Sequence, residues 1–273
     1  MKLPVVNNNA LANPVEWGSG VESVVVKAEW TGRQVAVKKM RLAKKDAHEK
    51  AYGRACIVRE ALALQMLTKS DAVPKCLGMM RGGGGLILEL LPGVTIESMW
   101  QNLPGVAPED DDHQELGKPM AAPIVMKLLK QVGQALEHAH ELKILHRDIH
   151  PGNIMWCEAK LQAHVIDWET ASGPPALAVH KRFKERIIGV GEYNAPEFKS
   201  NNSTAACDVW GYATISRELL CGKRPFTDAL PPQPTMDTAF GRMLQQCTDT
   251  ALPAATRPTM ADLMRVLAET KTV

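Results

Sequence analysis

The chain has 273 residues, 45% of them hydrophobic and 23% charged, a composition that can bury a core and argues against wholesale disorder. This length suits one two-lobed unit or two small domains, and a net charge of +2 gives no reason to expect nucleic acid or an anionic membrane as partner. The six cysteines show no C-x-x-C spacing, which argues against a zinc site and fits reduced thiols. No apolar run is long enough for a membrane span or a signal peptide, so we expect a cytoplasmic protein.

The first elements are expected to be strands. Residues 15–37 alternate apolar and polar positions around glycines, which predicts two or three strands with turns. Within them, GSGVESVV (Gly18–Val25) matches G-x-G-x-x-G-x-V except that Ser23 replaces the last glycine. Backbone without side chains can approach a triphosphate and donate N–H groups to it. Taken alone this signal is weak, and a bare turn is the simpler interpretation.

A lysine follows at the end of an apolar strand. Thr31-Gly32 predicts a turn into QVAVKK, which contains Lys38. An exposed strand-end lysine is the simple interpretation. The order of glycine loop, turn and V-A-V-K instead favours a lysine that pairs the α- and β-phosphates of a nucleotide.

Residues 44–70 are expected to form a helix. Ile57, Glu60, Leu64 and Leu67 fall on one face at helical spacing, so a carboxylate is set within an apolar stripe. Glu60 could be a rim residue beside solvated neighbours. A buried carboxylate needs a partner, however, and Lys38 is the candidate. Residues 82–85 then predict a turn between two strands, the second of which breaks at Pro92-Gly93 after Glu89 and Leu91.

The remainder is expected to be helical and to carry the chemistry. Residues 102–123 predict an exposed loop, and apolar spacing from 125 to 142 predicts an amphipathic helix. HRDIHPGN follows, and then IMWC and AHVID predict a short hairpin that presents Asp167 at its end. In an Asp-x₄-Asn loop such as Asp148 to Asn153, the carboxylate can orient an attacking hydroxyl while the amide oxygen reaches a metal, and Asp167 can bridge that metal to phosphates.

From about Trp17 to Met264 the chain resembles the eukaryotic protein kinase family, because eight motifs occur in the family's order and spacing. The later ones are GEYNAPE, DVWGYA, GKRPF and ATRPTM. The resemblance implies an ion pair between Glu197 and Arg257, and an Asp208 that braces the catalytic-loop backbone.

The resemblance also implies the fold and the site. The expected fold is α+β and bilobal, with a small β-rich N-lobe holding one main helix and a larger helical C-lobe. One kinase domain spans 1–273, with an extension at 1–13, the N-lobe at about 14–91 and the C-lobe at about 92–273. The implied cofactors are ATP and Mg²⁺, and the implied partner is a protein substrate. The implied catalytic residues are Asp148, Lys38, Glu60, Asn153 and His150; the nucleotide contacts are Gly18, Gly20, Ser23, Val25, Ala36, Lys38, Glu89, Leu91 and Met155; the metal ligands are Asn153 and Asp167.

Several positions depart from the family. Where protein Ser/Thr kinases usually carry a lysine two residues after the catalytic Asp, this chain has His150, either protonated to supply the charge or neutral and hydrogen-bonding only. D-F-G is replaced by Asp167, Trp168 and Glu169, so the glycine that lets this turn flip is absent. Between 226 and 257 there are too few residues for a full αG helix beside the helix that AFGRMLQQC suggests.

Two other functions stay open beside a protein Ser/Thr kinase. HRDIHPGN and VIDWE also resemble aminoglycoside- and choline-type small-molecule kinases, which lack the A-P-E segment and the Arg257-type partner. A pseudokinase scaffold is the third reading, weakened because Lys38, Glu60, Asp148, Asn153 and Asp167 are all present.

The expected activation segment lacks a central phosphosite. No Ser, Thr or Tyr lies between Ser172 and Tyr193. In related kinases the residue at Arg147 pairs with a phosphate on this segment. We therefore predict that a carboxylate, Glu185 or Glu192, or a backbone carbonyl satisfies Arg147, and that no activating phosphate is needed there.

Overall fold

The computed structural model describes residues 3–19, 23–41, 46–101, 120–177, 191–200, 203–222 and 238–270. It divides into two compact units. The first contains the chain up to Pro92 and the segment that begins at Asp167, and the second contains Gly93–Ile166 and the described residues from Gly191 onward. Among the described helices, none is both long and apolar enough to cross a bilayer.

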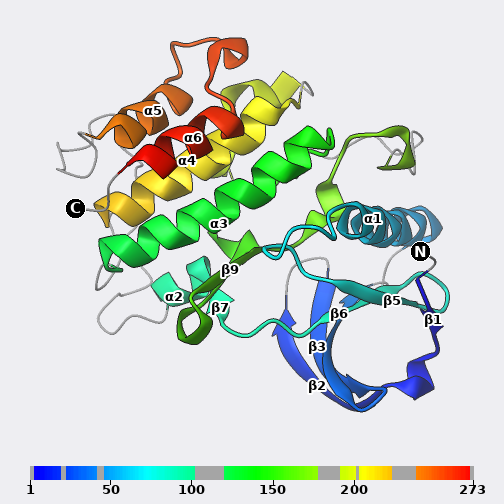
Figure 1. Cartoon of the computed structure of the whole chain (residues 1–273). Helices are drawn as coiled ribbons and strands as arrows, with labels where there is room; N and C mark the ends of the chain where they lie inside the picture. Colours follow the sequence, from blue (N-terminus) through cyan, green and yellow to red (C-terminus); the bar gives the residue numbers. More distant parts are fainter. Residues whose placement is uncertain are drawn as a thin grey trace. The chain divides into compact units, whose positions relative to one another are not determined.

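A six-stranded sheet forms the first unit (Figure 1), in the order β1-β5-β6-β4-β3-β2. Its strands are β1 (Val5–Val6), β2 (Ala12–Ser19), β3 (Ser23–Trp30), β4 (Arg33–Met40), β5 (Cys76–Met80) and β6 (Gly85–Glu89). The expected strands and turns are confirmed: Thr31 and Gly32 both have positive φ, the backbone that a two-residue hairpin between β3 and β4 requires. Strand β1 pairs in parallel with β5 and β2 begins at Ala12, so the expectation that 1–13 is an extension outside the N-lobe is wrong for these strands.

The sheet buries apolar side chains on both faces. On one face Val35 and Val37 pack with Ile87 and Met80. On the other, Met40 and Leu86 pack against α1 (Ala47–Met66). The helix is shorter than the predicted 44–70: Asp46 caps its N-terminus by accepting from the Glu49 backbone N–H at 2.8 Å, and residues 42–45 lie outside the described part of the chain.

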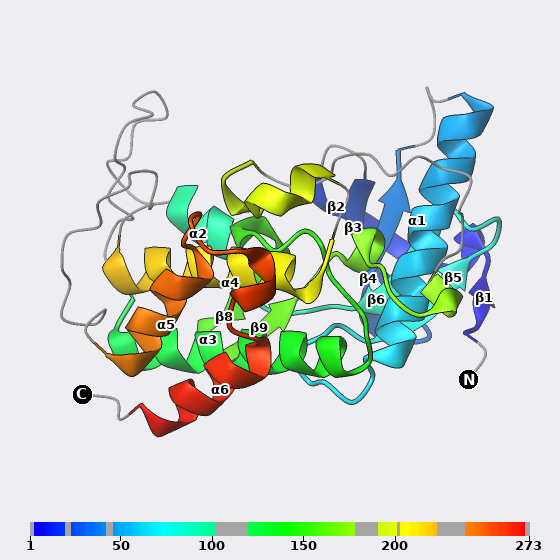
Figure 2. The ribbon, with the colours of Figure 1, turned by 90° about the horizontal axis from the view of Figure 1, so that it is seen from above.

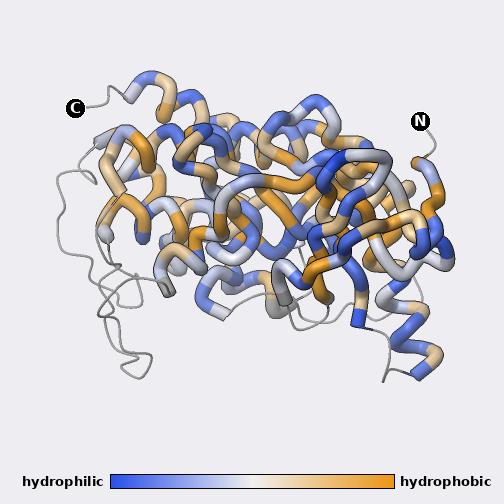
Figure 3. Tube along the Cα trace, turned by 90° about the horizontal axis from the view of Figure 1, so that it is seen from below, coloured by the Kyte–Doolittle hydropathy of each residue, from blue (hydrophilic) through white to orange (hydrophobic). Residues whose placement is uncertain are grey.

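The second unit consists mainly of helices (Figures 1 and 2). They are α2 (Ile96–Gln101), α3 (Ala122–Glu141), α4 (Ala205–Cys221), α5 (Ala239–Cys247) and α6 (Met260–Glu269). Helix α3 packs against α4 and α6, and α5 packs against α4 and α6. Figure 3 shows hydrophobic residues (orange) and hydrophilic residues (blue) alternating along the chain.

Helix α3 begins within the segment predicted as a loop. Ala122 and Pro123 belong to its first turn, because proline lacks only an N–H that has no intrahelical partner there. Residues 120–121 of the predicted loop precede the helix, and 102–119 lie outside the described residues. The predicted apolar stripe of α3 is confirmed, since Val125, Leu128 and Leu136 are fully buried.

A small three-stranded sheet, β7-β8-β9, completes the second unit. Strand β7 is Val94–Thr95, and β8 (Ile154–Cys157) and β9 (Gln162–Val165) form the antiparallel hairpin predicted before Asp167. The α+β class expected from the sequence is confirmed: a sheet-rich N-terminal part and a helical C-terminal part. All six cysteines are free thiols, as predicted.

Candidate functional site

Strand periodicity directs Lys38 toward α1. Side chains alternate between the faces of a strand, so Lys38 shares the face of Met40, which packs against Ile57 of α1. Glu60 lies one turn after Ile57 on the same helix face. The two side chains meet as predicted, with Lys38 Nζ 2.9 Å from Glu60 Oε2. Both are buried, at 4% and 1% exposure, so each charge depends on the other for stabilisation.

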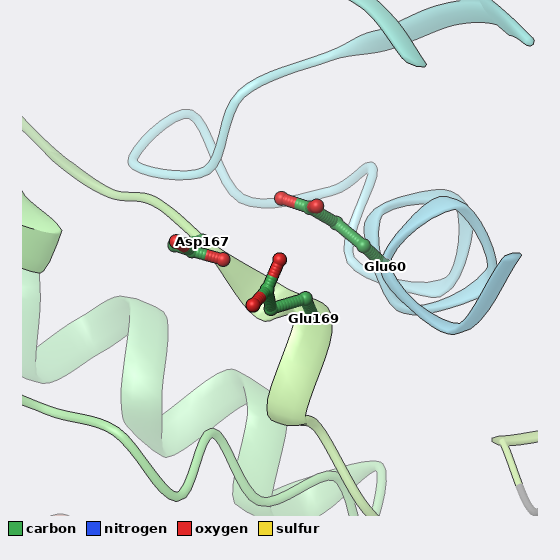
Figure 4. A group of neighbouring side chains, drawn as sticks. All are labelled: Glu60, Asp167 and Glu169. Carbon is green, nitrogen blue, oxygen red and sulfur yellow. The ribbon is translucent and has the colours of Figure 1, made fainter. Parts of the chain in front are cut away.

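Two more carboxylates reach the same ammonium. Lys38 Nζ lies 2.6 Å from Asp167 Oδ1 and 2.9 Å from Glu169 Oε2. Figure 4 shows the carboxylates of Glu60, Asp167 and Glu169. One oxygen from each of the three lies within 4.8 Å of one oxygen from each of the others. The sequence indicated neither contact, because it gave Asp167 only as a metal ligand and assigned no role to Glu169. A sign of the Glu169 contact was present in the sequence, because Glu169 stands two residues after Asp167, where related kinases have a glycine.

The electrostatics of this cluster favour a charged lysine. Burial by itself would lower the pKa of Lys38, but Asp167, Glu60 and Glu169 outweigh it and hold that pKa well above the ordinary range. Burial raises the pKa of Glu60, an effect that Lys38 opposes and the other two carboxylates reinforce. A buried group surrounded by such charges is typical of functional sites.

The glycine-rich hairpin runs beside Lys38. In the strand register Gly18 lies opposite Val25, and Val25 lies opposite Lys38. Within the described part of the chain, a Cβ added to Gly18 would meet only the Val25 Cβ, at 4.0 Å, so the described strands leave room for a side chain there. Glycine at this position is therefore not demanded by packing. Gly20 lies outside the described residues.

The other predicted nucleotide contacts occupy both units. Ser23 pairs with Met40 at the start of β3, and Ala36 lies between buried neighbours of β4. Glu89, at the end of β6, accepts a hydrogen bond from the Lys75 backbone N–H at 3.0 Å. Leu91 lies partly buried just after β6 in the first unit, and Met155 lies on β8 in the second.

The segment His146–Asn153 of the second unit, called the catalytic loop below, brings Asp148 and Asn153 together. The Asn153 amide nitrogen donates to the Asp148 carbonyl at 2.9 Å and to its carboxylate Oδ2 at 3.1 Å. Because these bonds orient the amide group, its oxygen is the atom left to face a cation. Asn153 is buried to 6% exposure, so this orientation is fixed by the surrounding chain.

A buried aspartate on α4 binds the backbone of the same loop. Asp208 accepts hydrogen bonds from the backbone N–H of His146 at 2.8 Å and of Arg147 at 2.7 Å, and its Oδ2 lies 2.9 Å from His140 Nε2. Burial would raise its pKa, but His140 and these contacts outweigh burial and lower it. The predicted bracing role is confirmed. Arg147 has a φ of 74°, a left-handed backbone that such bracing can maintain.

His150 closes the turn after Asp148. Its Nδ1 accepts a hydrogen bond from the Gly152 backbone N–H at 3.2 Å, and its Nε2 lies 3.7 Å from Asp148 Oδ2. A nitrogen that accepts cannot carry a proton, so this geometry favours a neutral imidazole with its proton on Nε2. Of the two interpretations left open by the sequence, the structure favours the hydrogen-bonding one.

The predicted ion pair of the A-P-E segment is present in the second unit. Arg257 Nη1 and Nη2 donate to the two carboxylate oxygens of Glu197, at 2.5 and 3.3 Å. Burial would raise the pKa of Glu197, but Arg257 outweighs it and lowers that pKa. Next to this segment, the Tyr193 hydroxyl bonds the buried Glu218 carboxylate at 3.0 Å, a contact that sequence reasoning missed.

Arg147 contacts residues that the sequence did not indicate. Its Nε donates to the Ser203 hydroxyl at 3.2 Å, and its guanidinium lies 5.8 Å from the Phe198 ring centroid. Of the two carboxylates proposed as partners, Glu185 lies outside the described residues. The Ser203 contact depends on a long-range approach that no local pattern reveals.

Comparison with known proteins gives consistent matches. A model of the protein kinase domain matches residues 13–271. A probable serine/threonine-protein kinase of Dictyostelium discoideum is 24% identical over 84% of this chain and 16% of its own length. The inhibitor of nuclear factor kappa-B kinase subunit alpha of Danio rerio is 36% identical over 40% of this chain and 14% of its own.

A bacterial relative points the same way. The serine/threonine-protein kinase PknA of Mycobacterium tuberculosis is 32% identical over 37% of this chain and 23% of its own length. The chain thus spans less than a quarter of the length of these relatives. With its catalytic loop, Lys38–Glu60 pair and Glu197–Arg257 pair in place, and a family match over nearly its whole length, the chain belongs to the protein kinase domain family.

Proposed function

We propose that this chain is an ATP- and Mg²⁺-dependent kinase that transfers the γ-phosphate to Ser or Thr hydroxyls of proteins. The observation that carries the proposal is the buried Lys38 ammonium held 2.9 Å from Glu60 and 2.6 Å from Asp167. Burying one cation with several carboxylates is costly, so a hydrophobic replacement would serve stability better. A role in gripping the α- and β-phosphates explains why the charge is there.

The glycine of the hairpin supports nucleotide binding. Gly18 has room for a Cβ, so packing within the sheet does not select glycine at this place. A phosphate chain that approaches the backbone closely does select it. The hairpin therefore contributes backbone N–H groups to ATP, next to the strand that carries Lys38.

Asp148 is the residue that orients the attacking hydroxyl and accepts its proton. Its carboxylate is 17% exposed and therefore within reach of a substrate, while Asn153 holds Oδ2 at 3.1 Å. Phosphoryl transfer depends mostly on positioning and charge neutralisation. The Asp208 contacts, which fix the backbone beside Asp148, thus support the reaction geometry.

The donor chemistry fits Mg²⁺. Asn153 offers an amide oxygen and Asp167 a carboxylate, the oxygen ligands that Mg²⁺ prefers alongside substrate phosphates. When bound, the ion neutralises charge on the phosphate oxygens. Asp167 is then a ligand on which turnover depends as strongly as on Asp148.

Two observations favour a protein substrate. The Glu197–Arg257 pair anchors the A-P-E segment, and small-molecule kinases of the aminoglycoside and choline type lack that pair. The relatives named above are protein kinases. The second candidate is a small-molecule kinase, favoured by His150 in the H-x-D-x-H-P-x-N pattern and by the VIDWE segment.

The deciding experiment incubates the full chain with labelled ATP, Mg²⁺ and either a peptide and protein library or a metabolite extract. Label in Ser or Thr of protein supports the proposal. Label in metabolites alone supports the small-molecule candidate, and intact ATP binding with no transfer identifies a pseudokinase. Lys38→Met and Asp148→Asn should each lower transfer by at least about a hundredfold. Lys39→Met is the matched control, because it removes the same charge from the neighbouring strand position.

A further inference from the structure

Among the three carboxylates around Lys38, Glu169 is the one that related kinases lack at this position. It stands where related kinases have the glycine of D-F-G, and its Oε2 lies 2.9 Å from Lys38 Nζ with the side chain 18% exposed. Lys38 consequently contacts three carboxylates, those of Glu60, Asp167 and Glu169.

Contacts with α1 hold the backbone of Glu169 in place. Arg59, the neighbour of Glu60 on α1, donates from Nη1 to the Glu169 carbonyl at 3.2 Å. The short helical turn that carries Glu169, Trp168–Thr170, packs against α1, and Trp168 and Thr170 are buried. The same helix thus holds Glu60 and the backbone of Glu169, so the carboxylate is kept close to Lys38.

The number of donors on the ammonium limits what Lys38 can bind. A lysine ammonium has three N–H donors, and Lys38 Nζ gives two of them to Glu60 Oε2 at 2.9 Å and Asp167 Oδ1 at 2.6 Å. Glu169 Oε2 lies 2.9 Å from Nζ as an ion pair without a hydrogen bond between the two atoms. A nucleotide phosphate that takes the third hydrogen bond from Lys38 therefore approaches the Glu169 carboxylate, because Glu60 is 1% exposed and Asp167 is the proposed metal ligand.

We propose that Glu169 competes with the nucleotide phosphates for Lys38 and thereby lowers the affinity of this chain for ATP and ADP. The inference rests on the proposed function, because it takes ATP as the ligand of Lys38. Glu169 also opposes the phosphates directly, since two anions that approach the same ammonium repel each other. Nucleotide binding is therefore weakened while the Glu169 carboxylate stays beside Lys38.

The test measures dissociation constants of the full chain for ATP, ADP and adenosine by calorimetry, with EDTA and separately with Mg²⁺. Glu169→Gln keeps the size of the side chain and removes its charge. We expect roughly tenfold tighter binding of ATP and ADP, because the anion that competes with the phosphates for Lys38 is lost. Adenosine has no phosphate, so its affinity should not change. Glu29→Gln, near the β3–β4 turn, removes the same charge elsewhere in the first unit and should change none of the three.

The outcomes separate this inference from the proposed function. If the wild-type chain binds ATP and transfers phosphate while Glu169→Gln binds ATP no more tightly, this inference alone is wrong. Weaker binding of the variant in Mg²⁺ would make Glu169 a metal ligand and also overturn it. If neither protein binds ATP, both proposals fail. Thermal unfolding checks that the variant is folded, and Glu169→Ala provides a second uncharged side chain that must show the same tighter binding.

Discussion

Replacing Asp208 by asparagine tests how strongly α4 holds the catalytic loop. The aspartate is 1% exposed and accepts from two backbone N–H groups, at 2.8 and 2.7 Å, besides its contact with His140. An asparagine has one acceptor oxygen, so its amide nitrogen would face one of these donors. A buried donor without an acceptor costs about 1–3 kcal/mol, and losing a charged acceptor weakens the other bond. We expect the free energy of unfolding to fall by about 2–4 kcal/mol.

Urea unfolding followed by circular dichroism measures this loss. Asp249→Asn is the matched control: the exposed Asp249 accepts from the Ala251 N–H at 2.8 Å in a turn that asparagine forms equally well, so we expect a change below about 0.5 kcal/mol. A loss below about 1 kcal/mol for Asp208→Asn would refute the reasoning. The lowered pKa of Asp208 also gives the direction of a pH effect. The ionised carboxylate stabilises the fold above the ordinary aspartate pKa, and this stabilisation is lost as the pH falls through the lower pKa of the folded protein. The difference between wild type and variant should shrink as the pH falls below about 4, where the Asp208 carboxylate becomes protonated.

Three further predictions concern Arg257, His150 and Arg147. Arg257→Lys cannot keep both contacts with Glu197, so unfolding should cost about 1–3 kcal/mol less in urea titrations, whereas Arg265→Lys, exposed on α6, should change it by under 0.5 kcal/mol. His150→Asn keeps an acceptor for the Gly152 N–H and should retain more activity than His150→Lys, which has none; an active His150→Lys enzyme with a flattened profile between about pH 6 and 8 would instead show that a charged imidazole is needed. Phosphatase treatment should leave turnover unchanged, because Arg147 has the Ser203 hydroxyl as a partner; a collapse that rephosphorylation at Thr170, Ser172 or Tyr193 reverses would contradict this.

Patterns that repeat over short distances were readable in the sequence. Periodicity placed β2 to β6 of the first sheet, the apolar stripe of α3, the hairpin before Asp167 and the α1 face that carries Glu60. The Lys38–Glu60 pair followed because a carboxylate within an apolar stripe needs a partner, and only one lysine lay in the expected strand position. The family's motifs added the Glu197–Arg257 pair and the bracing by Asp208.

Other contacts were decided only by tertiary structure. The pairing of β1 with β5, the third carboxylate on Lys38 and the approach of Ser203 to Arg147 each join segments more than fifty residues apart. Periodicity and local propensity report on the turns and faces of one element, whereas such contacts depend on how several elements pack. The protonation of His150 was likewise undecided until the fold placed the Gly152 N–H against Nδ1, because an imidazole nitrogen takes its role from the partner it meets.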